Sequence, residues 1–100
     1  MKVRFAPQAV RDLERIADWI AHADPDAATR LFKVLREKAE GLGEMPFAFP
    51  VYRGGEALGF RSRVHGSYLI LYQVTDHVRI ARIVHGARDR AQLLTELEAE

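Results

Sequence analysis

The last apolar run of the chain, "VRIARIVH" at residues 78–85, ends in a histidine and leads directly into a glycine and several charged residues. Cutting an RNA chain requires deprotonation of a 2′-oxygen, protonation of the leaving oxygen and stabilisation of a charged phosphorane. Histidine can perform either proton transfer near neutral pH, and arginine can stabilise the phosphorane. One hypothesis is therefore an RNA-cleaving site on one face of a sheet, composed of His85 with Arg61, Arg63, Arg82 and Arg88.

The same residues also allow a structural interpretation. Asp89 directly follows Arg88, so the two side chains can form an ion pair that fastens the turn after the strand. Residues 53–90 carry seven arginines, no lysine and three acidic residues, a net charge of +4 in a chain whose total is +1. Such a block is either the solvated face of a sheet or a contact surface for an anionic partner, nucleic acid or acidic protein.

Other kinds of site find little support. No two of the four histidines have the His-x-x-x-His spacing of a metal-binding helix, so no metal site is expected. The glycines of "RGGEALG" do not match a phosphate-binding loop, no serine lies in a nucleophile elbow, and no cofactor is expected. The chain contains no cysteine, which excludes disulfides and thiol catalysis. This composition fits a cytoplasmic protein, and neither a membrane span nor a secretory signal is predicted.

Two helices are predicted after a short first strand at residues 2–5. Pro7 suits the first turn of a helix, and Asp24-Pro25 combines an N-cap residue with a second helix start. Because few residues separate the two helices, they must form an antiparallel hairpin. Each helix has one apolar face. The two faces consist of Val10, Leu13, Ile16, Ala17 and Ile20, and of Ala28, Leu31, Leu35, Ala39 and Leu42.

The loop "EMPFAFPVYRGGEA" at residues 44–57 is unusually apolar. We expect Phe47 and Phe49 to cover the core, and Tyr52 and Arg53 to lie at the surface. Three strands should follow, at residues 58–64, 67–74 and 78–85, with a tight turn at His65-Gly66.

In the last strand the alternation of apolar residues fails near Arg82, which predicts a β-bulge there. The remaining residues can form a short helix with Leu93, Leu94 and Leu97 on its inner side. The order strand, helix, helix and three strands predicts a single α+β domain over residues 1–100. In it, a small, largely antiparallel four-stranded sheet packs against the helical hairpin.

Taken in order, these features resemble the ParE/RelE superfamily of toxins from bacterial type II toxin–antitoxin modules. The resemblance lies in the proline-started helix, the acid-Pro-acid junction at residues 24–26, the arginine strand at residues 61–63 and the strand "SYLILYQV". Its most specific part is "RIVHGARD" at residues 82–89, close to the R-V-L-H-G-R-R-D ending of ParE-like members. The match covers nearly the whole chain.

The resemblance implies a cognate antitoxin whose C-terminal segment wraps the toxin and fills the groove between helices and sheet. It implies contact with operator DNA only through that antitoxin, and no contact with a membrane. Two helices over one face of the sheet leave apolar surface, and the aromatic residues near it are candidates for antitoxin binding. They are Trp19, Phe32, Phe47, Phe49 and Tyr52.

The superfamily divides by target. ParE-like members inhibit DNA gyrase and have no established catalytic residues, whereas RelE-like members cleave mRNA on the ribosome with basic residues and often a C-terminal tyrosine or histidine. This chain has no lysine after Lys38 and no tyrosine after Tyr72, but it keeps His85. The "HGARD" ending favours a gyrase inhibitor without catalytic residues, whose target contacts would be Arg61, Arg63, His85 and Arg88.

Two alternatives stay open. The first is a ribosome-dependent mRNA endonuclease whose catalytic residues would be Arg61, Arg82, His85 and Arg88. The second is an inactive binding module with the toxin fold that serves as a corepressor. The resemblance does not identify the antitoxin, the stoichiometry of the complex or the target.

Overall fold

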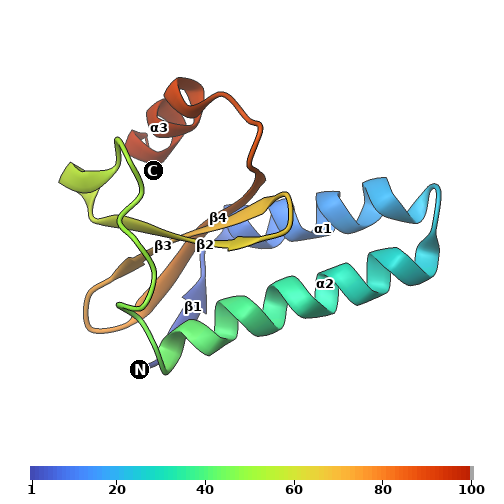
Figure 1. Cartoon of the computed structure of the whole chain (residues 1–100), viewed down its shortest axis with the longest axis horizontal. Coiled ribbons are helices and arrows are strands. Elements are labelled where there is room, and N and C mark those ends of the chain that lie inside the picture. Colours follow the sequence, from blue (N-terminus) through green and yellow to red (C-terminus); the bar gives the residue numbers. More distant parts are fainter. Residues whose placement is uncertain (100) are drawn as a thin grey trace.

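The computed structural model describes residues 1–99. Three helices and a four-stranded sheet follow the predicted order, so the α+β prediction and the short C-terminal helix are confirmed (Figure 1). The elements are β1 (Val3–Phe5), α1 (Pro7–Ala21), α2 (Pro25–Glu40), β2 (Phe60–His65), β3 (Tyr68–Val74), β4 (Val78–His85) and α3 (Arg90–Glu98), with 3-10 turns at Gly41–Gly43 and Glu56–Leu58.

The sheet is mixed, with the strand order β1-β4-β3-β2. β2, β3 and β4 form an antiparallel meander, and β1 runs parallel to β4. The parallel pair arises because the helical hairpin carries the chain from one edge of the sheet to the other. β1 is short and pairs with β4 at Val78, Arg79 and Ile80. The following half of β4 therefore lies at an edge of the sheet.

The predicted irregularity in β4 is confirmed as a shift of register against β3. Leu71 pairs with Arg82 and Tyr72 with Ile80, so Ala81 is the extra residue of a bulge. The bulge lets Ile80 and Ile83 both face the helical hairpin, while Ala81 faces the opposite side. The apolar alternation of β4 is thereby restored on each side of the extra residue.

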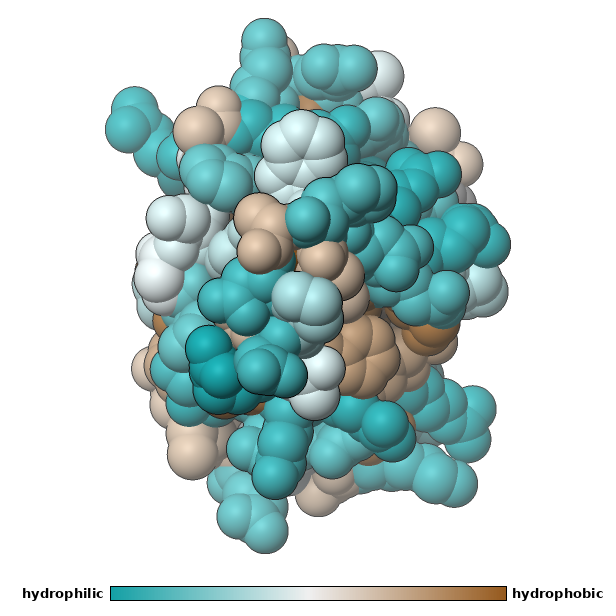
Figure 2. All heavy atoms as spheres, turned by 90° about the vertical axis from the view of Figure 1, so that its right-hand side faces the viewer, coloured by the Kyte–Doolittle hydropathy of each residue, from teal (hydrophilic) through white to brown (hydrophobic). Residues whose placement is uncertain are grey.

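The helices begin where local chemistry requires. Pro7 occupies the first turn of α1, where its missing N–H costs nothing. Asp24 caps α2, because its carboxylate accepts a hydrogen bond from the Ala27 N–H at 3.0 Å. α1 and α2 then lie side by side in antiparallel directions (Figure 1). The end of the molecule that carries their connecting turn is mostly hydrophilic, with smaller apolar areas between polar side chains (Figure 2).

Residues 1–99 form two apolar cores, one on each face of the sheet. The larger core lies between the sheet and the helical hairpin and includes Leu35, Leu42 and Tyr72. The smaller core lies under α3, whose Leu93 and Leu97 pack on Phe60. α3 therefore covers the sheet face that the hairpin leaves open, and it stands apart from the hairpin in Figure 1.

The structure corrects two expectations about the loop after α2. Tyr52 is buried in the smaller core, because its N–H donates to the Phe60 carbonyl oxygen at 2.8 Å and so aligns the loop with β2. Phe47 does not cover the core and is 64% exposed. The Arg61 guanidinium lies 5.2 Å from the centre of its ring, a cation–π arrangement at the surface. Phe49 is half-buried against the larger core, and Arg53 is exposed, both as predicted.

Candidate functional site

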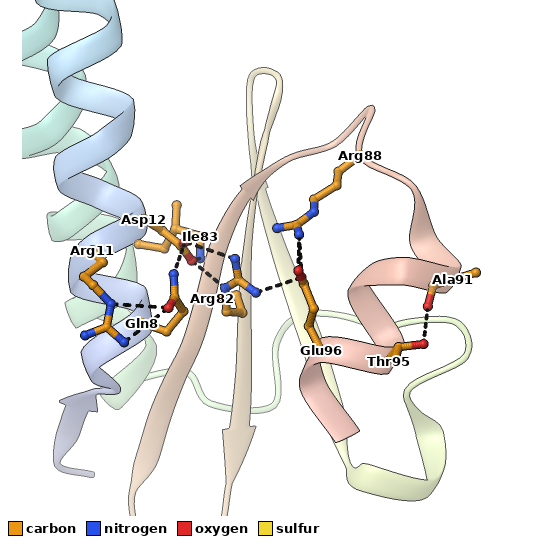
Figure 3. Close-up of polar contacts among 9 residues, drawn as sticks. All are labelled: Gln8, Arg11, Asp12, Arg82, Ile83, Arg88, Ala91, Thr95 and Glu96. Carbon is orange, nitrogen blue, oxygen red and sulfur yellow. Dashed lines mark hydrogen bonds and ion pairs between the residues drawn. The ribbon is translucent and has the colours of Figure 1, made fainter. Parts of the chain in front are cut away.

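Arg82 is buried where α1, β4 and α3 meet, and only 7% of its surface is exposed. Its Nε and one terminal nitrogen donate to the two carboxylate oxygens of Asp12, at 2.7 and 3.1 Å. The other terminal nitrogen donates to Glu96 Oε2 at 3.1 Å (Figure 3). Hydrogen bonding to Asp12 raises the pKa of Arg82 above its already high usual value. Each guanidinium nitrogen is thus committed to a carboxylate.

Asp12 also closes the open edge of β4. Its Oδ2 accepts the Ile83 N–H at 3.0 Å, and its Oδ1 accepts a hydrogen bond from the Gln8 amide at 3.0 Å (Figure 3). β1 does not reach Ile83, so the carboxylate takes the place of a neighbouring strand there. A charged side chain at this position also prevents another strand from pairing with the edge.

Sequence reasoning did not include Asp12 among the candidate site residues. A signal was present, because Asp12 lies three residues after Ala9 and four before Ile16, and therefore on the same face of the helix. An acidic residue within an apolar face indicates a buried partner of opposite charge. The sequence offered several arginines for that role, and the fold selects Arg82.

The ion pair between Arg88 and Asp89 that the structural interpretation allowed does not form, because both side chains have other partners. One terminal nitrogen of Arg88 donates to both carboxylate oxygens of Glu96, at 2.6 and 2.5 Å. Asp89 instead caps α3, where it accepts a hydrogen bond from the Gln92 N–H at 3.2 Å. The short turn after β4 places Asp89 at the helix start, which a carboxylate stabilises, and Arg88 then faces the next turns of α3. Glu96 joins Arg88 to Arg82 (Figure 3).

Arg61 and Arg63 lie on β2 and hold the apolar loop and α2 in place. Arg61 donates to the Phe49 carbonyl oxygen at 2.7 Å. Arg63 donates to the Lys38 carbonyl oxygen at 3.1 Å, and its guanidinium lies 4.7 Å from the centre of the Phe49 ring. The five residues predicted to share one catalytic surface are therefore divided, with Arg61 and Arg63 in structural contacts away from His85.

The structure does place His85 in a cleft, between the end of β4 and α1, with a volume of about 380 Å³. His85 is exposed, and its Nδ1 accepts the Ala87 N–H at 3.1 Å. Its ring and that of Tyr68 form a T-shaped pair, with the ring centres 5.6 Å apart. The lining of the cleft is Asp12, Arg15, Ile16, Trp19, Tyr68, Arg82, Ile83, Val84, His85 and Arg88.

The cleft brings together residues that sequence reasoning had separated. Trp19 was predicted to bind one partner, and His85 and Arg88 to bind another, yet all three line this cleft. Trp19 is 80% exposed, the highest value among the large apolar side chains of the described chain. Arg15 was not among the predicted site residues, and it follows Asp12 by one turn of helix on the same face.

A second hollow, an apolar groove of about 510 Å³, lies on the other side of α1. Val10 and Leu13 of α1 form one wall, Phe32 of α2 another, and β1 the floor. Charged residues stand at the rim. The full lining is Val3, Phe5, Val10, Leu13, Glu14, Phe32, Arg36 and Glu40.

Of the five aromatic residues predicted near a partner groove, only Phe32 lines this apolar groove. Trp19 lies in the cleft, Phe47 and Phe49 lie beside the arginines of β2, and Tyr52 is buried. Within residues 1–99, no three histidine, aspartate or glutamate side chains are grouped as metal ligands would be. None of the three helices described has the length and hydrophobicity needed to cross a bilayer.

Comparisons with known proteins agree with this architecture. The family model described as the ParE toxin of the type II toxin–antitoxin system parDE matches residues 3–90. A candidate toxin of Sinorhizobium fredii, Y4kP, is 28% identical over 95 residues, which are 93% of this chain and 96% of that protein.

Two solved structures are also similar. The chromosomal ParDE toxin–antitoxin system of P. aeruginosa matches with a TM-score of 0.72 and 20% identity, covering 85% of this chain and 95% of that chain. The RelBE2 toxin–antitoxin complex of Mycobacterium tuberculosis matches with a TM-score of 0.62 and 30% identity, covering 84% of this chain and 95% of that chain.

Proposed function

This chain belongs to the ParE family of toxins of type II toxin–antitoxin systems, and we propose that it inhibits bacterial growth by binding DNA gyrase. A cognate antitoxin, with which it forms a complex, neutralises it. Both solved relatives are toxin–antitoxin systems, which supports the antitoxin as partner. The proposed target places the action of the toxin in the bacterial cytoplasm.

The hydrogen bonds of Arg82 favour a toxin that acts by binding a protein over one that cleaves RNA. A nuclease of this kind needs a base, an acid and a cation that is free to contact the phosphorane. Arg82 was the candidate cation nearest to His85 along β4, but its three guanidinium nitrogens already donate to Asp12 and Glu96. Arg61 and Arg63 are engaged with carbonyl oxygens elsewhere. Arg88 is paired with Glu96, so each of the four arginines that the catalytic hypothesis named is already engaged.

The test is to express the toxin alone in bacteria and to assay the purified protein in two reactions, gyrase supercoiling and ribosome-dependent mRNA cleavage. We expect growth arrest, inhibited supercoiling and intact mRNA. Cleavage at defined codon positions that falls roughly 100-fold or more in His85→Ala would instead establish the nuclease alternative. Absence of growth arrest from a folded, expressed toxin would favour the inactive binding module.

We propose the apolar groove beside α1 and α2 as the docking site of the antitoxin. An amphipathic antitoxin helix would bury apolar side chains against Phe32 and Leu13, and its polar residues would meet the charged rim. The site residues differ from the predicted set, since Phe32 alone is retained from it. This groove uses the face of α1 that lies away from the His85 cleft.

Val10→Lys tests the groove. Val10 is 42% exposed and lines the groove, so a lysine is tolerated by the fold but places a charge where apolar antitoxin side chains would pack. We expect the affinity for the antitoxin to fall at least about tenfold, measured by calorimetry with the purified antitoxin. Val64→Lys is the matched control, because Val64 is an exposed valine on β2 outside the groove. Equal affinities for the two variants would contradict the proposed docking site.

A further inference from the structure

The charges around the His85 cleft are unevenly compensated. The cleft continues into a polar hollow, with which it shares Arg15, Arg82 and Arg88. Arg82 is paired with Asp12, and Arg88 with Glu96 (Figure 3). Within residues 1–99, the side chain of Arg15 forms neither a hydrogen bond nor an ion pair, and Arg15 is exposed at the rim of the cleft. Its positive charge is therefore open to a partner.

The same rim carries an aromatic surface. The Trp19 side chain lies one turn of α1 beyond Arg15 and is almost fully exposed, and Tyr68 packs against His85 at the opposite wall. Tryptophan, tyrosine and arginine are the residues most enriched among those that dominate the energy of protein–protein interfaces. Such a combination recognises an apolar side chain and an adjacent carboxylate together.

The ion pairs of Arg82 and Arg88 also argue against a nucleic-acid ligand. A nucleic-acid backbone carries one charge per phosphate and binds to rows of uncompensated lysine and arginine side chains. Here the carboxylates of Asp12 and Glu96 stand among the arginines and neutralise two of them. A chain of phosphates would find Arg82 and Arg88 already paired and would meet the partly exposed Glu96 carboxylate, whereas a single carboxylate fits at Arg15.

We infer that this cleft is the surface that binds the target, and that it accepts a protein segment with one carboxylate, held by Arg15, beside an apolar side chain stacked on Trp19. The inference rests on the proposed function in one respect, that the toxin acts by binding a protein. Under this inference, target binding and antitoxin docking use different faces of α1, and Arg15 and Trp19 are target-binding residues.

The first test measures toxicity, whatever the target. Arg15→Glu and Trp19→Ala, expressed as full-length toxins, should each require roughly 30-fold more protein for the same growth arrest. Arg30→Glu and Phe47→Ala are matched controls, because they make the same charge reversal and a comparable aromatic truncation at exposed positions outside the cleft. Trp19→Phe should restore most of the toxicity. Thermal unfolding of the purified variants establishes that they are folded.

The second test uses the fact that Trp19 is the sole tryptophan. Toxin labelled with 5-fluorotryptophan gives one fluorine resonance, which reports directly on the cleft. We expect this resonance to shift and broaden when purified gyrase is added, to stay unchanged with a single-stranded RNA oligonucleotide, and to respond weakly in Arg15→Glu.

The outcomes separate the two proposals. If Arg15→Glu and Trp19→Ala are as toxic as the parent chain, the cleft is not the target surface and the inference is wrong for any target. If both variants lose toxicity but the fluorine resonance does not change when gyrase is added, the cleft assignment stands and the gyrase proposal fails. A response to RNA that Arg15→Glu abolishes would overturn the inference in favour of a nucleic-acid ligand.

Discussion

Asp12→Ala is expected to lower the free energy of unfolding by about 3–5 kcal/mol, because it leaves the buried Arg82 guanidinium without its main counter-charge. The substitution also deprives the Ile83 N–H of its acceptor at the edge of β4. Small domains have a total stability of about 5–15 kcal/mol, so the variant should lose a large part of it. Urea denaturation followed by circular dichroism measures the change.

Two further variants isolate the cause. Asp18→Ala removes an exposed carboxylate from the same helix and should change the stability by less than about 0.5 kcal/mol. The double variant Asp12→Ala with Arg82→Met removes both charges, so it should be more stable than Asp12→Ala alone. A cost below about 1 kcal/mol for Asp12→Ala would show that the ion pair does not hold α1 to the sheet edge.

Tyr72→Ala should cost about 3–5 kcal/mol, since it empties the centre of the larger core. Tyr72 is fully buried on β3, and its hydroxyl donates to the Pro46 carbonyl oxygen at 2.9 Å. Tyr72→Phe keeps the ring and removes only this hydrogen bond, so we expect a loss of about 1 kcal/mol. The pair of variants, compared by urea denaturation, separates packing from hydrogen bonding. Equal losses in both would assign the whole effect to the hydroxyl.

Tyr72 also predicts a dependence of stability on alkaline pH. Burial raises the pKa of the Tyr72 phenol above its ordinary value of 10.0, despite the opposing influence of Arg61 and Arg63. A folded-state pKa above the unfolded value means that the contribution of the proton is complete below pH 10 and is lost as the pH rises through the folded pKa. The urea midpoint of the parent chain should therefore fall more steeply above pH 10 than that of Tyr72→Phe. Parallel curves would contradict this.

The sequence predicted the local features of the fold because short-range chemistry determines them. Pro7 and Asp24 mark the starts of the two long helices, and both act as the capping rules require. The broken alternation near Arg82 located the bulge to within one residue. In each case the responsible atoms lie within a few positions of one another, so the pattern along the chain carries the information.

The candidate site was predicted only in part. His85 and Arg88 do lie at a cleft, as expected for residues at the end of the last strand. The structure divides the predicted cationic set, since Arg61 and Arg63 contact backbone carbonyl oxygens of Phe49 and Lys38 and Arg82 is paired with Asp12. Tyr52 was assigned to the surface, but it is buried in the smaller core, to which α3 contributes Leu93 and Leu97.

By itself, the sequence determined the order of the elements, the ends of the helices, the bulge in β4 and the likeness to ParE-type toxins. The tertiary structure decided which charges are free. Asp12 and Arg82 are 70 positions apart, and Glu96 joins them from α3. Residue types and their spacing show that charges are present. Only the packing of α1 and α3 against the edge of β4 shows that Arg82 and Arg88 are paired with carboxylates and that Arg15 is not. Electrostatic pairing depends on distances of a few ångströms between elements that are remote in the chain.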